Sequence, residues 1–300
     1  MHVNNKNYSL ELYNALYVIL IIMSTIPDLL RHLPDAPKRI YTKGSLPDPE
    51  HTIYLTVIGS RKYTTYGKDV CESLIRGLRG YPIVIVSGLA LGMDAIAHRA
   101  ALNANLKTIA IPGSGLDTSV LYPATNRRLA EEILDAGGAL LSEFEPTTPA
   151  AHWTFPKRNR IMAGISQATL VIEAGVKSGT RITARLATEY NRDVYAVPGS
   201  IFSETSEGAN QLIREGATPI TTPEELLDAL GFDVTNVTPA DAMQGCTEDE
   251  KLVLQLLASP MSKGNLIRKL SMSPSDANAL LAMMEIKGLI TESLGEVHRS

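Results

Sequence analysis

Three cations within four residues form the densest positive cluster in the chain. Lys157, Arg158 and Arg160 lie in the hexapeptide 155–160, which reads Phe-Pro-Lys-Arg-Asn-Arg. The chain as a whole is acidic, with 28 Lys and Arg against 32 Asp and Glu. A polyanion would therefore need a local cluster such as this one. A solvated basic loop has the same composition, so the hexapeptide indicates an anion site only where other segments add to it.

Loops rich in glycine and serine offer such additional segments. Glycine lets the backbone approach a ligand closely, and helix N-termini present free N–H groups that suit phosphate. Short turns use glycine for local reasons too, so the informative feature is that several loops share this composition. Thr180 could equally serve as a plain N-cap. The loops are Gly59-Ser60-Arg61, Ser87-Gly88-Leu89-Ala90-Leu91-Gly92, Pro112-Gly113-Ser114-Gly115, Glu173-Ala174-Gly175, Ser178-Gly179-Thr180 and Pro198-Gly199-Ser200.

Several catalytic and nucleotide-binding motifs are missing. The sequence has no G-x-G-x-x-G turn with an acidic residue at the next strand end, no G-x-x-x-x-G-K-[ST] and no G-x-S-x-G. This argues against a nicotinamide dehydrogenase, a P-loop ATPase and an α/β-hydrolase. His98 is interpreted as a structural histidine hydrogen-bonded to Asp94, one helical turn earlier. Glu173 has no evident partner for work as a general base.

The two cysteines and an N-terminal apolar run indicate in which cellular compartment the protein is found. Cys71 and Cys246 lie far apart and lack partners at metal-ligand spacing, which excludes a zinc cluster or disulfide framework and favours the cytoplasm. Cys71 is expected to be buried and inert in a helix. The uncharged run 12–27 is shorter than the roughly 20 apolar residues of a spanning helix and lacks a cleavage site. It is predicted to pack or to self-associate rather than to cross a membrane.

Apolar strands alternate with helices from residue 53 onward, and these elements must position the loops. Continuous apolar strands of this kind predict a parallel sheet covered on both faces. We therefore expect an α/β fold with a doubly wound, mostly parallel Rossmann-like sheet, whose site lies at the carboxyl ends of the strands. Strands are predicted at 53–58, 83–86, 107–111, 139–143, 168–172 and 194–197, and helices at 67–78, 93–102, 126–136, after the hexapeptide, and at 180–190.

Four parts are predicted along the 300 residues. They are a short N-terminal extension (1–45), the Rossmann-like core (46–232), a polar linker (233–246) and a small C-terminal domain (247–300). In the last of these, Thr247 is expected to cap a helix, and two further helices and a β-hairpin follow. This order predicts a winged helix.

The motifs together resemble the DprA/Smf family of DNA-processing proteins. The resemblance runs from about residue 36 to 230, in order, and rests on specific segments. They are Gly59-Ser60-Arg61 with Tyr66-Gly67, Ser87–Asp94 with Ala97-His98, Gly115-Leu116-Asp117 with Tyr122-Pro123 and Asn126, Phe155–Ile161, Val171–Ala174, Ser178–Thr180, Val197–Ser200, Gly208–Ile213 and Gly216-Ala217.

This resemblance implies a protein of natural transformation that binds and protects single-stranded DNA and helps load RecA. It implies a homodimer that needs no metal or other cofactor, and no catalytic residues are expected. The family's basic pocket, carried over, would use the residues Gly59, Ser60, Arg61, Gly88, Phe155, Lys157, Arg158, Asn159, Arg160, Ser178, Gly179 and Thr180. Backbone N–H groups and cations would hold phosphates without reading sequence. Phe155 would offer a stacking face or act as a buried anchor, and Arg181 would extend the pocket or point to solvent.

Two departures from the family pattern limit what the resemblance implies. The segment before Pro27 is too short for the helical, SAM-like domain with which many members begin. The presumed recognition helix of the winged helix carries Asp276 and Glu285 with only Lys287 positive. A helix that reads a DNA groove is normally basic, so we favour a protein-interaction or auxiliary role for this domain.

An enzymatic alternative comes from related Rossmann-like proteins, the LOG-type nucleotide phosphoribohydrolases. They use a Pro-Gly-Gly-rich loop followed by a glutamate. This chain has Pro112-Gly113-Ser114-Gly115 without a glutamate soon after it, and Glu189 lies outside such a motif. We therefore expect binding rather than catalysis.

Overall fold

The chain forms two compact units that divide between Phe232 and Asp233. The computed structural model describes residues 22–176, 178–233, 247–257, 261–286, 289–293 and 295–299. Most of the apolar run 12–27, the segment 234–246 of the predicted linker, and Cys246 lie outside these ranges.

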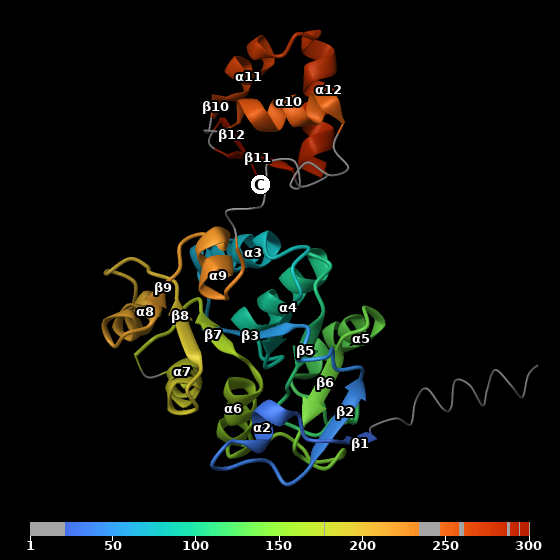
Figure 1. Cartoon of the computed structure of the whole chain (residues 1–300), viewed down its shortest axis with the longest axis vertical. Coiled ribbons are helices and arrows are strands. Elements are labelled where there is room, and N and C mark those ends of the chain that lie inside the picture. The colour runs from blue at the N-terminus through green and yellow to red at the C-terminus, as the bar shows by residue number, and fades with distance from the viewer. Residues whose placement is uncertain are drawn as a thin grey trace, which may run out of the picture. The chain divides into compact units, whose positions relative to one another are not determined.

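The larger unit is built on a nine-stranded sheet with the order β1-β2-β6-β5-β4-β3-β7-β8-β9 (Figure 1). The strands from β3 to β9 run parallel to their neighbours, while β2 pairs antiparallel with β6 and β1 antiparallel with β2. The predicted mostly parallel sheet is thus confirmed. The strands are β1 Ile22–Ser24, β2 Ile40–Gly44, β3 Ile53–Ile58, β4 Ile83–Ser87, β5 Thr108–Ala110, β6 Ala139–Ser142, β7 Ala168–Val171, β8 Asp193–Ala196 and β9 Thr218–Pro219.

Helices cover both faces of this sheet (Figure 1). One layer contains α3, α4, α5 and α9, and the other contains α2, α6, α7 and α8. All central strands are buried on both sides, which explains their unbroken apolar sequences. The helices are α2 Asp28–Arg31, α3 Thr65–Gly77, α4 Met93–Asn103, α5 Arg127–Asp135, α6 Thr154–Ile165, α7 Gly179–Glu189, α8 Glu204–Arg214 and α9 Pro223–Ala229, with a 3-10 turn at Ala124–Asn126.

Most predicted elements of the larger unit are found within a residue or two of their expected bounds. Cys71 is fully buried in α3, as expected, and burial raises the pKa of its thiol. The prediction missed the strands β1, β2 and β9 and the helices α2, α8 and α9. It also placed the basic hexapeptide before a helix, whereas α6 begins at Thr154 and contains all of it.

The C-terminal unit has the element order of a winged helix. Helices α10 (Glu248–Leu256), α11 (Lys263–Lys269) and α12 (Pro274–Ile286) accompany a three-stranded antiparallel sheet of order β10-β12-β11. Those strands are Met261–Ser262, Glu296–Arg299 and Ile290–Ser293. Thr247 caps α10 as predicted, since its hydroxyl accepts a hydrogen bond from Glu250 N (3.3 Å) while Glu250 Oε2 accepts one from Thr247 N (2.8 Å).

Candidate nucleic-acid interface

A groove of about 610 Å³ lies at the carboxyl ends of the parallel strands. It brings together three of the segments singled out in the sequence, which belong to the loop after β3 and the first turns of α6 and α7. Of the twelve predicted site residues, nine line this groove: Gly59, Ser60, Arg61, Phe155, Arg158, Asn159, Ser178, Gly179 and Thr180. Lys62, which sequence reasoning passed over, also lines it.

Gly88, Lys157 and Arg160 do not line the groove. Gly88 borders a small adjoining hollow that it shares with Arg61 and Phe155. Lys157 is exposed and holds its Nζ 5.1 Å from the centre of the Trp153 ring. Arg160 forms ion pairs with Glu143 and with Asp35. The basic hexapeptide is therefore split, because helical geometry turns its cations in different directions.

Arg158 is the buried member of the cluster. Only 5% of it is exposed, and its Nη1 donates hydrogen bonds to Gly88 O and, at 2.6 Å, to Ile111 O. These carbonyls directly follow β4 and β5, so one guanidinium ties two strand ends to α6. Burial lowers the pKa of Arg158, although the nearby Asp94 carboxylate opposes this.

Gly88 is required by this arrangement. A Cβ at residue 88 would lie 1.7 Å from Arg158 Nη1 and 2.5 Å from Asp94 Oδ2. Asp94 is buried under the groove, and its burial raises the pKa of its carboxyl while the charge of Arg158 lowers it. The floor of the groove thus carries the fixed positive charge of Arg158, which the nearby Asp94 carboxyl offsets in part.

Phe155 is half-buried, so it acts both as an anchor and as a wall of the groove. Its ring packs on the backbone of Gly113, where a Cβ would come within 2.5 Å of the ring. The Tyr122 ring meets it edge-on at 5.9 Å, and the Arg61 guanidinium lies 5.4 Å from its centre. The cation–π contact holds the exposed Arg61 side chain at the groove.

The loop that carries Arg61 is fixed by a buried carboxylate. Glu173, 1% exposed and two residues after β7, accepts hydrogen bonds from Thr64 N (3.0 Å), Thr64 Oγ1 (2.6 Å) and Thr205 Oγ1 (3.0 Å). The Thr64 hydroxyl in turn accepts from Gly67 N at 3.0 Å and caps α3. Glu173 therefore has the partners that the sequence did not reveal, and all of them point to a positioning role.

The start of α7 forms the third side of the groove. Thr180 does not cap the helix but donates its hydroxyl to Gly59 O at 3.1 Å, which joins this turn to the Arg61 loop. Ser178 occupies the N-cap without a capping hydrogen bond, and its buried Oγ has no partner among the described residues. The first N–H groups of a helix lack intrahelical partners, so this end is suited to an anion.

His98 is a buried structural residue, as predicted, but its partner is different. Its Nδ1 lies 2.7 Å from Thr108 Oγ1, whose hydroxyl donates to Ile85 O, and no hydrogen bond joins it to Asp94 within the described residues. The carboxylate of Asp94 instead accepts a hydrogen bond from Ala90 N at 3.4 Å and interacts with the charge of Arg158.

His98 makes the folded state sensitive to acid. Burial, with a further contribution from the charge of Arg158, lowers the pKa of His98 to about 3. An unfolded histidine titrates near 6.5, so between these values the unfolded chain binds one more proton and the free energy of unfolding falls by about 1.4 kcal/mol per pH unit as pH decreases. We expect His98→Asn to flatten this profile between about pH 6 and 4.5. Urea unfolding across that range checks it; parallel profiles for both proteins would contradict it.

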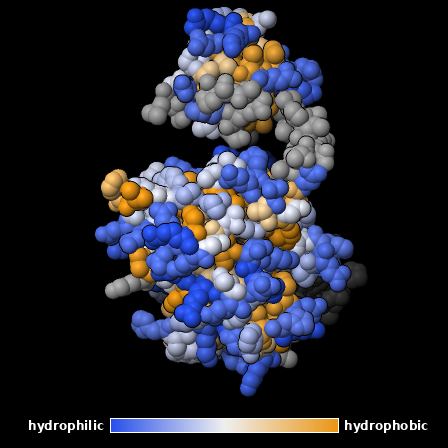
Figure 2. Space-filling view, turned by 60° about the vertical axis from the view of Figure 1, so that its left-hand side comes forward, coloured by the Kyte–Doolittle hydropathy of each residue, from blue (hydrophilic) through white to orange (hydrophobic). Residues whose placement is uncertain are grey.

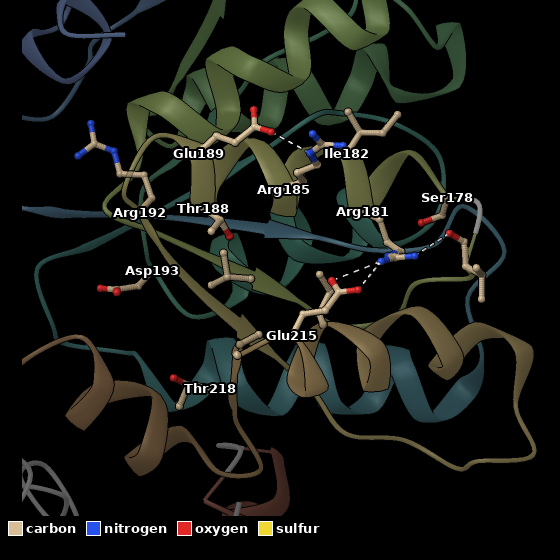
Figure 3. A pocket seen from close by; sticks show the side chains of 15 residues that line it. Ser178, Arg181, Ile182, Arg185, Thr188, Glu189, Arg192, Asp193, Glu215 and Thr218 are labelled. Carbon is tan, nitrogen blue, oxygen red and sulfur yellow. Dashed lines mark hydrogen bonds and ion pairs between the residues drawn. The ribbon is translucent and has the colours of Figure 1, made fainter. Parts of the chain in front are cut away.

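A larger hollow, of about 820 Å³, lies along α7, β8, α8 and β9 (Figure 3). Two of its three arginines are paired with carboxylates: Arg181 with Glu215 at 3.0 Å, and Arg185 with Glu189 at 2.8 Å. The third, Arg192, donates to the backbone carbonyls of Leu29 and Gly164. Arg181 thus neither extends the candidate groove nor points freely to solvent. Size alone therefore does not make this hollow the better phosphate site.

Exposed hydrophobic side chains form small, separate groups on the face of the larger unit seen in Figure 2. Among the residues that the structure describes, no helix has the length and apolarity to cross a membrane. Within the same residues, no group of three or more His, Cys, Asp or Glu side chains is arranged to hold a metal ion.

Comparison with known proteins places the chain in a family. The profile of the family described as DNA recombination-mediator protein A matches residues 17–231. The chain is 43% identical to protein Smf of Escherichia coli (strain K12) over 210 residues, which are 69% of this chain and 54% of that protein. It thus spans about half of that relative's length. It is 41% identical to DNA processing protein DprA of Streptococcus pneumoniae over 203 residues, 68% of this chain and 70% of that one.

Two solved structures share the fold. The crystal structure of DprA from Streptococcus pneumoniae superposes with a TM-score of 0.65 at 37% identity and covers 73% of this chain and 77% of its own. DprA from Helicobacter pylori, whose structure concerns the single-stranded DNA binding mode of that protein, superposes with a TM-score of 0.63 at 33% identity, covering 69% and 94%. These matches confirm the resemblance drawn from the motifs: the chain belongs to the DNA recombination-mediator protein A family, the DprA/Smf proteins.

Proposed function

We propose that this protein binds single-stranded DNA in the groove between the Arg61 loop, α6 and α7. The observation that carries the proposal is the convergence of Arg61, the buried Arg158 and the α7 N-terminus on one groove in an otherwise acidic protein. Phosphates would meet these groups, and bases would be left free of sequence-specific contacts. The matched protein from Helicobacter pylori, described by its DNA binding mode, supports this function.

Replacing Arg61 with alanine tests the groove directly. Arg61 is exposed and contacts Phe155 only through its guanidinium, so Arg61→Ala should leave the fold intact. We expect affinity for an oligothymidylate to fall about tenfold, and the slope of log K against log salt to become shallower by about 0.7 for the lost phosphate contact. Fluorescence anisotropy at several salt concentrations measures both quantities.

Arg99→Ala is the matched control, because Arg99 is an exposed arginine that does not line the groove. It makes the same charge change and should leave the slope almost unaltered. The double variant Arg61→Ala with Lys157→Ala tests whether the bound DNA strand also contacts Lys157, beside Trp153. If the affinity and the salt slope of this double variant both stayed at their wild-type values, the groove would be the wrong site.

The wider role of the family supplies the remaining proposals. We propose protection of single strands and loading of RecA during transformation or recombination, by a homodimer in the cytoplasm. The resemblance to the family supports these proposals. Analytical ultracentrifugation and RecA co-sedimentation on coated DNA test them.

The winged helix is proposed to contact protein rather than to read DNA. Two of its cations are engaged locally: Lys263 pairs with Glu292 at 2.8 Å, and Arg268 donates to Asn265 Oδ1 at 2.6 Å. Asp276 accepts from Ser273 at the start of α12. The Lys263–Glu292 pair leaves less positive charge available for phosphate, and Asp276 adds a negative charge at the start of α12.

The phosphoribohydrolase alternative remains testable. Binding rather than hydrolysis is supported by the buried, hydrogen-bonded state of Glu173 and by the lack of a glutamate soon after Gly115. Incubation with nucleoside monophosphates and chromatography for free base decides between them; base release abolished by substitution in the groove would favour the enzyme.

A further inference from the structure

A second hollow, of about 590 Å³, lies next to the groove at the same edge of the sheet. Its lining differs in chemistry, because among the described residues that border it none is a cation. It is lined by the hydroxyls of Thr64, Ser200, Ser203 and Ser206, together with Tyr66 and Pro198, and Glu173 closes it. With no cation to neutralise a phosphate and with the Glu173 carboxylate at its wall, this hollow suits a neutral base or a sugar better than a phosphate.

One loop separates the two hollows. Gly59 to Lys62 border the groove, while Thr64 and Tyr66, only a few residues further along, border the hydroxyl-lined hollow. Glu173 fixes Thr64, so the dividing loop is rigid at that point. A strand whose phosphates lie on Arg61 therefore has a direct continuation across Tyr66.

An exposed aromatic ring projects from the loop that borders this hollow. Phe202 is 93% exposed and its neighbour Ile201 84% exposed, so neither contributes to the core. The base of their loop is nevertheless fixed: Asn210 exchanges two hydrogen bonds with Gly199 (3.1 and 3.0 Å), and the Tyr66 hydroxyl donates to Pro198 O at 2.8 Å. The Phe202 ring is therefore exposed to solvent on a loop whose base is fixed, and its faces are free to stack on a ligand.

We propose that Phe202, with the hydroxyl-lined hollow beside it, is a base-binding subsite for single-stranded nucleic acid whose phosphates occupy the groove. The inference rests on the proposed function and adds where a base beyond the groove would stack. Stacking of a base on an aromatic side chain tolerates every base, so this subsite strengthens binding without selecting a sequence.

The test separates bases from phosphates. Binding of an oligothymidylate and of an abasic oligonucleotide of equal length is measured by anisotropy for wild type, Phe202→Ala and Ile201→Ala. We expect Phe202→Ala to lose about fivefold to tenfold in affinity for oligothymidylate, with an unchanged salt slope and unchanged affinity for the abasic strand. Ile201→Ala should behave as wild type, because an aliphatic side chain has no π-face.

A spectroscopic readout accompanies the affinities. In a Trp153→Phe background, Phe202→Trp places the single tryptophan of the chain on the loop, and its fluorescence should be quenched by oligothymidylate but not by the abasic strand. Wild-type affinity of Phe202→Ala for oligothymidylate, or an equal loss on both strands, would overturn the subsite while leaving the groove standing. Altered self-association without altered DNA binding would assign Phe202 to a protein contact instead. A wild-type protein that binds neither strand would remove the proposed function itself.

Discussion

Arg158→Met should lower the free energy of unfolding by about 3–5 kcal/mol, the range seen when one partner of a buried charged network is removed. The guanidinium is the donor to Gly88 O and Ile111 O, and a methionine leaves both carbonyls without it. Each buried group left unsatisfied costs about 1–3 kcal/mol. Asp94 would also lose the charge that opposes the rise in its pKa.

Urea unfolding of the whole chain, followed through the larger unit by the fluorescence of Trp153, measures the loss. Lys157→Met is the matched control, because it removes the neighbouring cation, which is exposed. It should change the free energy of unfolding by no more than about 0.5 kcal/mol. A loss below about 1 kcal/mol for Arg158→Met would mean that water replaces the guanidinium at the two carbonyls. Arg158 would then act mainly on a bound phosphate, and its hydrogen bonds to the two strand ends would contribute little to stability.

Glu173→Ala should cost about 2–4 kcal/mol and also weaken DNA binding. The change leaves Thr64 N–H without its acceptor and frees the Thr64 and Thr205 hydroxyls. Because Thr64 ends the loop that carries Arg61, we expect that loop to move more freely and the affinity for oligothymidylate to fall at a temperature where the variant is still folded.

Glu173→Gln separates charge from geometry. Its amide oxygen accepts some of the same hydrogen bonds, so it should lie between wild type and Glu173→Ala in both stability and affinity. Glu131→Ala, an exposed site in α5, should be nearly neutral. Loss of stability with unaltered DNA affinity would show that the Arg61 loop is held by other contacts, such as that from Thr180.

The sequence predicted the parallel strands β3 to β8 because each carries its own signal, an apolar run next to a loop that contains glycine. Strand β2 has no such signal: Ile40–Gly44 ends in Thr, Lys and Gly, and it becomes a strand only by pairing with β6. Helix α8 was missed for a related reason, since Gly208 weakens the helical pattern. The structure requires this glycine, because a Cβ there would lie 2.5 Å from Ala174 O.

The candidate site was predictable as a set of loops but not as a set of contacts. Counting charges identified the hexapeptide, yet Lys157, Arg158 and Arg160 differ entirely in burial and partners once they lie on a helix. Glu173 had no visible partner because Thr64 and Thr205 are far from it in sequence. Such long-range pairings depend on strand order, which local patterns do not encode.

Most residues of the groove come from three segments, 58–62, 152–162 and 178–183, that meet only when β3 and β7 lie side by side. No isolated peptide from the chain has this arrangement, so an anion held there has negligible affinity for the unfolded state. Mass action then makes the ligand a stabiliser of the entire larger unit. At a concentration one hundred times its dissociation constant it would add about 2.7 kcal/mol, roughly the stability that a broken Glu173 network removes. A cell rich in single strands would thus tolerate mutations in this protein that a cell without them would not.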